Sequence, residues 1–433
     1  MRFSRHLNTS NDLSSQKRYI ASFNDFSRFL LAIKDVNTNT LVGTSTLFVD
    51  YRKRNVNVGF LIFLSKAGNN YATLALELLM EFFNTNFPCF TVIIGTRSSN
   101  ISMKKVAVKN NFNLDLQFAE SDTEIVYYKR IIPPINKTHT PVLPEFIHGA
   151  KLIGVAANDA GGAQQVYSLM EKLNKPFVAL LNGPAIDIFD KGNVEFKALN
   201  IDSDLIKCDL IITGSGWMSD LEFNALKICE ESNIPSLTIL DHWVNYKARF
   251  NRNFEINPNM LAVTNTNALE LAKKDFPNTP ILLIPDYQLE GYRTEINREF
   301  TPSKILILLE PNSSISDEFN IDLDMESEII RKAVLINQKN FYGGVVIRPH
   351  PSTQSYNLHV KNLIETNTCV SISSNSNLVD DLKFTKIVLG FSSYGLYLSS
   401  MCGIETYSYF ANMTGHWTNS FPKILSLSSK NLS

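Results

Sequence analysis

The stretch KLIGVAANDAGGAQQVYSLMEKL, residues 151–173, joins an apolar run to an amphipathic run through a turn that contains two glycines. The first run predicts a buried β-strand and the second an α-helix. The same alternation continues downstream in the runs PFVALLN, CDLIITG, LEFNALKICEE and PSLTILD. Near-continuous apolar strands between amphipathic helices are typical of a parallel sheet that helices cover on both faces.

A second series of this kind begins after Ser303, with the runs KILILLEP, ESEIIRKAVLINQ, GGVVIRPHP, TKIVLGFSS and YGLYLSSMCG. A chain of 433 residues is too long for a single core. We therefore predict two doubly wound, Rossmann-like α/β lobes, at residues 150–300 and 301–433. Residues 131–149 contain four prolines and no periodic pattern, which predicts an extended linker after an N-terminal domain of residues 1–130.

Composition and charge exclude several classes of protein. A formal net charge of -1 provides no basic field that would attract nucleic acid. No apolar run reaches the roughly 18 residues of a membrane span, and no hydrophobic signal region follows the N-terminal sequence MRFSRHLNTSNDL. The cysteines never occur as CxxC and the histidines never pair as HxxxH, so we predict neither disulfides nor a resident metal. We expect a cytoplasmic protein without a nucleic-acid partner or a transmembrane segment. Peripheral association with a membrane glycan assembly and the oligomeric state stay open.

The N-terminal domain contains the stretch SKAGNNYATLALELLMEFF, residues 65–83, which predicts a loop followed by a helix. Residues 38–63 precede it and predict an antiparallel pair of strands. Backbone N–H groups at such a helix start favour a phosphate, whose close approach requires residues that tolerate a positive φ. Glycine, present at Gly68, tolerates a positive φ best. Asparagine, present at Asn70 and Asn111, is the next most tolerant residue type. One buried helical stripe is predicted, formed by Tyr71, Leu74, Ala75, Leu78, Leu79, Phe82 and Phe83.

The order strand, loop, helix, strand, asparagine, helix resembles the GNAT N-acetyltransferase family across residues 1–130. The family's loop reads Gln/Arg-x-x-Gly-x-Gly/Ala, and the matching segment is SKAGNNYA, residues 65–72, with Asn70 at the last position of that pattern. Asn100 and the run VAVKNNF, residues 106–112, match the end of the family's pattern. The resemblance implies an α+β fold, acetyl-CoA as cofactor, and a cofactor site formed by Gly59, Phe60, Lys66, Gly68, Asn70, Tyr71, Ala72 and Asn100.

Two further positions bear on catalysis in this domain. GNAT enzymes often carry a glutamate on the strand before the loop and a tyrosine on the later helix, as base and acid. The corresponding positions hold Asn57 and Ala107, neither of which exchanges a proton at neutral pH. The resemblance then implies catalysis by proximity and by polarisation of the thioester near Gly59 and Phe60.

Polar and aromatic side chains gather where the predicted strands of the first lobe end. The segments DAGG of residues 159–162, GSGW of residues 214–217 and DHW of residues 241–243 each follow a strand. In a parallel α/β sheet such strand ends form the ligand-binding edge. Aromatic rings that stack and carboxylates that accept hydrogen bonds suit a sugar. Alternative candidates for the catalytic base are Asp159 and Asp241, and His242 is a further catalytic candidate.

In the second lobe, the motif RPHPS of residues 348–352 follows one predicted strand and FSSYG of residues 391–395 follows the next. Prolines on both sides hold the histidine rigidly, and paired hydroxyls at a helix start suit a phosphate. These motifs resemble the His-Pro and Ser-Ser motifs of GT-B glycosyltransferases of the bacterial sialyl, polysialyl and Kdo type. The resemblance implies a nucleotide sugar and a sugar acceptor as ligands, with a nucleotide-sugar site formed by Gly161, Gly162, Trp217, Arg348, His350, Ser392, Ser393 and Gly395.

Together the two resemblances imply a bifunctional enzyme of bacterial surface-polysaccharide or nonulosonate biosynthesis. It would acetylate an amino sugar with acetyl-CoA and transfer a glycosyl group from a nucleotide-activated sugar. The acidic triplet of the sialyltransferases has no clean match, so hydrolysis or epimerisation of a nucleotide sugar is an alternative reaction for the lobes. A third hypothesis follows from the missing acid and base, namely that the GNAT domain is catalytically dead and serves binding or assembly.

Overall fold

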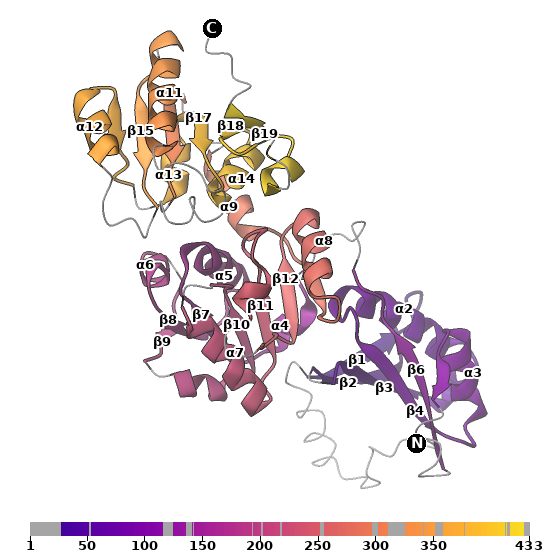
Figure 1. Cartoon of the computed structure of the whole chain (residues 1–433). Coiled ribbons are helices and arrows are strands. Elements are labelled where there is room, and N and C mark those ends of the chain that lie inside the picture. Colours follow the sequence, from indigo (N-terminus) through magenta and orange to yellow (C-terminus); the bar gives the residue numbers. More distant parts are fainter. Residues whose placement is uncertain are drawn as a thin grey trace.

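The computed structural model describes residues 27–51, 53–115, 124–135, 141, 143–192, 194–200, 202–216, 219–251, 255–296, 302–310, 325–340, 342–350, 358–375, 377–411, 413 and 416–427. These residues form three sheets in three consecutive parts of the chain (Figure 1). We call the parts the N-terminal domain (up to residue 131), the N-lobe (residues 143–296) and the C-lobe (residues 302–427). The predicted fold class, an α+β domain followed by two Rossmann-like lobes, is confirmed.

The N-terminal domain is built on a six-stranded sheet in the order β1-β2-β3-β4-β6-β5. Its elements are β1 (Arg28–Lys34), β2 (Leu41–Asp50), β3 (Asn55–Ile62), η1 (Leu64–Lys66), α2 (Tyr71–Asn86), β4 (Thr91–Arg97), α3 (Ile101–Lys109), β5 (Asn113–Asp115) and β6 (Ile125–Ile131). β2 and β3 form the predicted antiparallel pair. The helices α2 and α3 pack against β3 and β4 and against each other.

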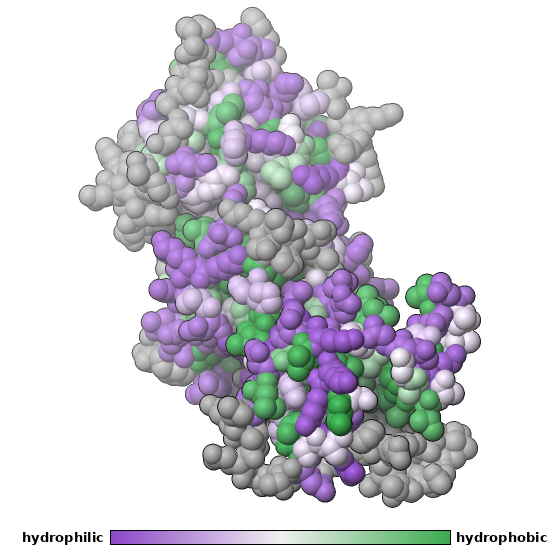
Figure 2. Space-filling model, turned by 90° about the vertical axis from the view of Figure 1, so that its right-hand side faces the viewer, coloured by the Kyte–Doolittle hydropathy of each residue, from purple (hydrophilic) through white to green (hydrophobic). Residues whose placement is uncertain are grey.

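The buried face of α2 differs from the predicted stripe. Its buried apolar residues are Leu76, Leu79, Met80 and Phe83. Leu74 and Leu78 are instead 49% and 66% exposed, so the prediction was wrong for these two. Two overlapping apolar sets occur at helical spacing in this helix, and packing on the sheet selects the set that faces inward. Figure 2 shows one face of the molecule, on which apolar side chains, in green, lie among polar side chains, in purple.

The N-lobe contains a seven-stranded parallel sheet in the order β13-β12-β11-β10-β7-β8-β9. Its strands are β7 (Ile153–Ala157), β8 (Phe177–Leu181), β9 (Lys197–Ala198), β10 (Leu210–Thr213), β11 (Ser236–Ile239), β12 (Met260–Val263) and β13 (Ile281–Leu283). Its helices are α4 (Glu145–Gly149), α5 (Ala160–Leu173), α6 (Pro184–Asp190), η3 (Asp202–Lys207), α7 (Leu221–Ser232), η4 (Lys247–Arg249), α8 (Thr266–Asp275) and α9 (Tyr287–Ile296). The strand order reverses between β7 and β10, and a doubly wound sheet binds ligands at such a point.

The C-lobe repeats this topology in a six-stranded parallel sheet in the order β16-β15-β14-β17-β18-β19. Its elements are β14 (Lys304–Leu308), α11 (Met325–Asn340), β15 (Val345–Arg348), α12 (Leu358–Thr366), β16 (Val370–Ile372), α13 (Leu378–Leu382), β17 (Thr385–Gly390), α14 (Tyr394–Met401), β18 (Glu405–Ser408), η5 (Trp417–Ser420) and β19 (Ile424–Ser426). The corresponding reversal lies between β14 and β17. Each lobe therefore has one crevice of its own at the carboxyl ends of its strands.

Aromatic side chains join the two lobes. The ring of Trp243, at the end of β11 in the N-lobe, stacks on Trp417 and Tyr394 of the C-lobe with centroid distances of 4.5 and 5.4 Å. Phe421 and Tyr397 meet the same ring edge to face. Trp243 is only 6% exposed, so its predicted role as a sugar-stacking ring was wrong, and it packs the lobes together instead. No described helix is long and apolar enough to cross a membrane.

Candidate functional site

The loop before α2 has the backbone conformation that the sequence predicts. Gly68 and Asn70 have φ values of 86° and 62°, and Asn111 has a φ of 59°. Asn70 is the N-cap of α2, yet its side chain makes no capping hydrogen bond. The first N–H groups of a helix have no partner within the helix, so this start is suited to an anion.

Strands β3 and β4 form an opening beside this loop. They pair in parallel only from Asn55 opposite Thr91 to Asn57 opposite Ile93. β3 continues to Ile62 and stays paired with β2 along its whole length. From residue 58 onward, the edge of β3 that faces β4 therefore has no strand partner among the described residues. Gly59 and Phe60 lie in this open part, where the resemblance to the GNAT family places them beside the cofactor.

Several of the predicted cofactor residues already make contacts within the protein. The Tyr71 hydroxyl donates to Asp35 Oδ2 at 2.6 Å, and this bond lowers the pKa of Asp35 to about 2. Asn100 caps α3 by accepting from the Met103 N–H at 3.1 Å and donates to Thr96. The Lys66 carbonyl accepts from Asn69. We call the loop of residues 66–72 before α2 the cradle. Tyr71 ties the end of this loop to Asp35, whereas Gly68, Asn70 and Ala72 contribute backbone.

Neither expected acid–base position of the domain carries a proton-exchanging side chain. Asn57 lies exposed on β3, and Ala107 is fully buried on the inner face of α3. Ala107 therefore belongs to the core rather than to a catalytic surface. At these two positions the domain therefore lacks the base and the acid that GNAT enzymes often carry.

The second candidate site lies at the point where the N-lobe sheet reverses. β11, β10 and β7 are neighbours, so the segments after them come together at one edge. A Cβ on Gly161 would lie 2.3 Å from Asp241 Oδ2, and one on Gly162 would lie 3.1 Å from the Gly214 Cα. The glycine pair therefore lets α5 approach these turns closely. Asp159, Asp241 and His242 are brought together as expected, whereas Trp217 lies outside the described residues.

Asp241 is held as a carboxylate. Arg249 Nη1 lies 2.8 Å from its Oδ1, and the Ser215 hydroxyl donates to the same oxygen at 2.7 Å. Burial alone would raise the pKa of Asp241, but the Arg249 charge and the Ser215 bond lower it overall. Of the two candidates for the base, Asp241 is thus the one already committed to an ion pair.

His242 reaches from the N-lobe to the C-lobe. Its Nε2 lies 3.1 Å from the Ser392 carbonyl oxygen, which can only accept, so we assign the proton to Nε2. Burial, with the nearby Arg249 charge, lowers the pKa of His242 to about 4. The ring is therefore neutral at physiological pH, and its buried Nδ1 has no hydrogen-bond partner among the described residues.

Glu222 belongs to the same site. The sequence places it in the helix after the GSGW strand end but does not mark it as a catalytic candidate. It stands in the first turn of α7 and is only 3% exposed. Its Oε1 accepts the Asn158 N–H at 2.8 Å, and no described residue bonds to Oε2. Burial raises the pKa of Glu222 to about 7, and the charges of Asp159 and Asp241 act in the same direction. An acidic residue at a helix start is commonplace, so no sequence signal distinguishes this one.

The C-lobe contributes His350 and the serine pair to the edge that faces the N-lobe. Burial lowers the pKa of His350, and the Asp159 charge in the N-lobe opposes this shift. The Ser392 hydroxyl accepts from Trp417 Nε1 at 2.8 Å, and the Ser393 hydroxyl accepts from the Gly395 N–H at 3.1 Å. The Ser393 hydroxyl retains its proton for donation to a ligand, whereas Ser392 Oγ also lies 3.3 Å from His416 Nε2. Glu310 Oε1 accepts the Ser392 N–H at 2.5 Å, so this N–H is not left for a phosphate.

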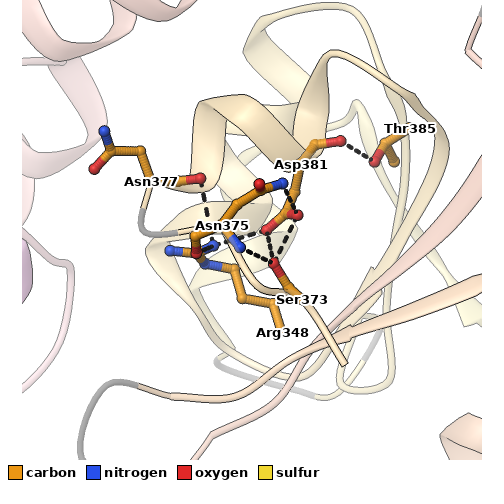
Figure 3. Close-up of polar contacts among 6 residues, drawn as sticks. All are labelled: Arg348, Ser373, Asn375, Asn377, Asp381 and Thr385. Atoms are coloured by element: carbon orange, nitrogen blue, oxygen red, sulfur yellow. Dashed lines mark hydrogen bonds and ion pairs between the residues drawn. The ribbon is translucent and has the colours of Figure 1, made fainter. Parts of the chain in front are cut away.

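Arg348 is tied into a network of its own within the C-lobe (Figure 3). Its Nη1 lies 2.7 Å from Asp381 Oδ2 and also donates to the carbonyl oxygens of Asn375 and Asn377. The Ser373 hydroxyl bonds to the same carboxylate at 2.7 and 2.8 Å. Arg348 therefore fixes the loop between β16 and α13 in this structure. Gly395 likewise serves packing, because a Cβ there would lie 2.7 Å from Leu308 Cδ1.

Comparison with protein families identifies the N-terminal part of the chain. Residues 1–113 match the family model described as an acetyltransferase (GNAT) domain. No curated protein sequence matches the chain. Among the described residues, no group of three metal-ligating side chains is placed to hold a metal ion.

Several solved structures are similar to parts of the chain. S. aureus MnaA with UDP aligns over 60% of this chain and 79% of that chain, with 10% identity and a TM-score of 0.45. Methanocaldococcus jannaschii UDP-GlcNAc 2-epimerase with UDP-GlcNAc and UDP aligns over 64% and 88%, with 9% identity and a TM-score of 0.44. The microcin C7 self-immunity acetyltransferase MccE, with acetyl-CoA and AMP, aligns over 28% and 73%, with 19% identity and a TM-score of 0.25. The match to the family model and the three sheets show an N-terminal GNAT acetyltransferase domain followed by two Rossmann-like lobes.

Proposed function

We propose that the N-terminal domain transfers the acetyl group of acetyl-CoA to an amino sugar, and that the two lobes transfer the glycosyl group of a nucleotide-activated sugar to a sugar acceptor. The main support for acetyl transfer by the N-terminal domain is the opening between β3 and β4 beside the start of α2. The pantetheine arm of acetyl-CoA contains two amide groups, so it can bind an open strand edge as an added strand does. Its pyrophosphate then meets the N–H groups that follow Gly68 and Asn70.

The proposal of glycosyl transfer is based on the two crevices, one at the carboxyl ends of the strands of each lobe, which face each other. We place the nucleotide phosphate against Ser392, Ser393 and His350, and the sugar against the N-lobe edge with Asp159 and Glu222. Such an enzyme belongs to bacterial surface-glycan synthesis, and it works in the cytoplasm because both activated substrates are made there. An amino sugar that requires acetylation serves both halves of one chain.

A matched pair of glycine variants tests the cradle. Gly68 and Gly403 have φ values of 86° and 83°, and a Cβ at either would have open space around it. Gly68→Val and Gly403→Val should therefore strain the backbone alike, but only Gly68→Val should weaken acetyl-CoA binding in calorimetry. Equal acetyl-CoA affinity in the two variants would contradict the cradle.

Product analysis tests the reaction of each half. The full chain is incubated with acetyl-CoA and a panel of UDP- and CMP-activated amino sugars, and released CoA and nucleotide are measured. Nucleotide release that requires an added sugar acceptor supports transfer, whereas release without an acceptor supports hydrolysis. Interconversion of the sugar epimers supports epimerisation.

One observation favours a second role for the N-terminal domain, namely acetyl-CoA binding without turnover. The position of the family's tyrosine is the fully buried Ala107, and the position of its glutamate is Asn57. Calorimetric binding of acetyl-CoA together with no CoA release from any amino-sugar acceptor would support this role over acetylation.

A further inference from the structure

The Glu222 side chain extends from the first turn of α7 to the turn between β7 and α5. Its Oε1 accepts the Asn158 N–H at 2.8 Å, and this bond fixes the carboxyl group. The residue is 3% exposed, and its Oε2 bonds to none of the described residues. Buried polar atoms in proteins are nearly always paired, so an unpaired carboxylate oxygen at a ligand-binding edge indicates a group that acts on a ligand.

The turn between β10 and α7 leaves room for this carboxyl group. A Cβ on Gly216 would lie 2.7 Å from Glu222 Oε1 and 3.0 Å from Asp159 Oδ2. The missing side chain therefore lets both carboxyl groups border the same turn, one deep in the site and the other half-exposed. This turn lies at the reversal of strand order between β7 and β10.

The charges around Glu222 favour its neutral form at acidic pH and its carboxylate above pH 7. The titratable groups that face it are Asp159, from the turn after β7, and Asp241, from the end of β11. Arg249 compensates the charge of Asp241 directly, at 2.8 Å, and offers no such contact to Glu222. Burial and these two carboxylates together raise the pKa of Glu222 to about 7, where a base is most effective at physiological pH.

We propose that Glu222 is the catalytic base of the lobes, in the nucleotide-sugar reaction of the proposed function on which this inference rests. Its Oε2 takes the proton of the attacking hydroxyl, from the acceptor or from water, while the oxygen of that hydroxyl bonds to the anomeric carbon of the sugar. The bond from the anomeric carbon to the phosphate oxygen breaks, and its electron pair leaves with the nucleotide. Glu222 then returns the proton to solvent.

The isosteric variant Glu222→Gln separates proton transfer from a structural role. Glutamine still offers an oxygen to the Asn158 N–H but cannot take a proton. We expect turnover of the nucleotide sugar to fall about 100- to 10,000-fold, with KM and the melting temperature unchanged and with loss of the limb of the pH profile near pH 7. Asp209→Asn is the matched control, because Asp209 Oδ2 accepts the Lys151 and Leu152 N–H groups at the opposite end of β7. It should keep the wild-type rate and pH profile.

Two readouts keep this assignment distinct from the proposed function. If wild type and Glu222→Gln release nucleotide at the same rate with the same pH profile, the assignment is overturned and the proposed function stands. If the wild type neither binds nor turns over any nucleotide sugar, the proposed function fails and the assignment, which rests on it, fails with it. Infrared difference spectra of an active wild type provide the second readout of the assignment. A protonated-carboxyl band that titrates near pH 7 in wild type and Asp209→Asn, and is missing in Glu222→Gln, supports it. Absence of that band from the wild type overturns it.

Discussion

The two candidate sites are built from different kinds of contact. The cradle of the N-terminal domain uses backbone conformation at Gly68 and Asn70, within a few residues of the helix start. The site of the lobes depends on side chains far apart in sequence, such as Asn158 and Glu222, which are 64 positions apart. A backbone site therefore tolerates most side-chain changes, whereas the site of the lobes depends on each charged partner.

One side-chain contact from each site illustrates this difference. Asp35 and Tyr71 meet at 2.6 Å beside the cradle, where both residues are partly exposed to solvent. Asp241 and Arg249 meet at 2.8 Å with both side chains buried. Water screens the first pair and replaces either partner when it is lost. No water replaces a lost partner in the second, so a buried charge would remain uncompensated.

The largest effect is expected at the buried pair. Arg249→Met leaves Asp241 buried without its counter-charge and should lower the free energy of unfolding by about 3–5 kcal/mol in urea titrations. The control is Lys191→Met, which breaks the exposed pair with Asp187 at 3.1 Å and should cost about 0.5 kcal/mol. Equal losses in the two variants would remove the distinction between the sites.

The same pair gives the expected pH dependence. The folded-state pKa of Asp241 lies below its ordinary value of 3.8, so the pair stabilises the fold at pH values above about 4. This stabilisation is lost as the pH falls through the folded-state pKa. The stability difference between wild type and Arg249→Met should therefore shrink as the urea titrations are repeated at lower pH.

The next effect is expected at the turn over Glu222. Gly216→Ala places a methyl group where the Glu222 and Asp159 carboxyl groups lie, and a displacement of this kind costs about 100-fold in turnover. Nucleotide release should fall by that factor, while acetyl-CoA binding stays unchanged. Gly291→Ala is the control, because nothing lies within 4 Å of a Cβ at that position. A parallel loss of acetyl-CoA binding in Gly216→Ala would show that the sites are not independent.

A smaller effect is expected at Asn70. Its φ of 62° suits glycine and strains alanine, so Asn70→Ala should lower stability by about 1 kcal/mol and Asn70→Gly should not. Asn233, at the end of α7 with a φ of 57°, provides the control Asn233→Ala with the same strain away from the cradle. Thermal unfolding measures the strain and calorimetry the acetyl-CoA affinity. Weakened binding in Asn233→Ala would show that the effect is not specific to the cradle.

The smallest effect is expected from Tyr71→Phe. Loss of the hydroxyl should move the pKa of Asp35 from about 2 toward 3.8, as measured by NMR titration of that carboxyl. Because the folded-state pKa is depressed, the small stabilisation from this bond is present above pH 4 and is lost as the pH falls toward 2. Melting at neutral pH should change little, since both groups are in contact with water. An unchanged titration of Asp35 would show that Tyr71 does not hold it.

The sequence predictions that the structure confirms depend mostly on local sequence patterns. The strands β2 and β3, the start of α2 and the positive φ at Asn70 and Asn111 each depend on a few neighbouring residues. The doubly wound lobes followed from apolar runs that alternate with helices over long stretches. The prediction failed at Leu74 and Leu78, because the helix offered two apolar faces and only the sheet selects between them.

The sequence by itself therefore determined the order of elements, the two kinds of fold and the backbone of the cradle, because steric limits on φ and the periods of helix and strand act locally. Tertiary structure alone decided what each side chain does in the lobes. It buried Trp243 between the lobes, paired Asp241 with Arg249, and left Glu222 with an oxygen that bonds to no described residue. Burial and the distance between charges set these roles, and both arise only when segments far apart in the chain meet.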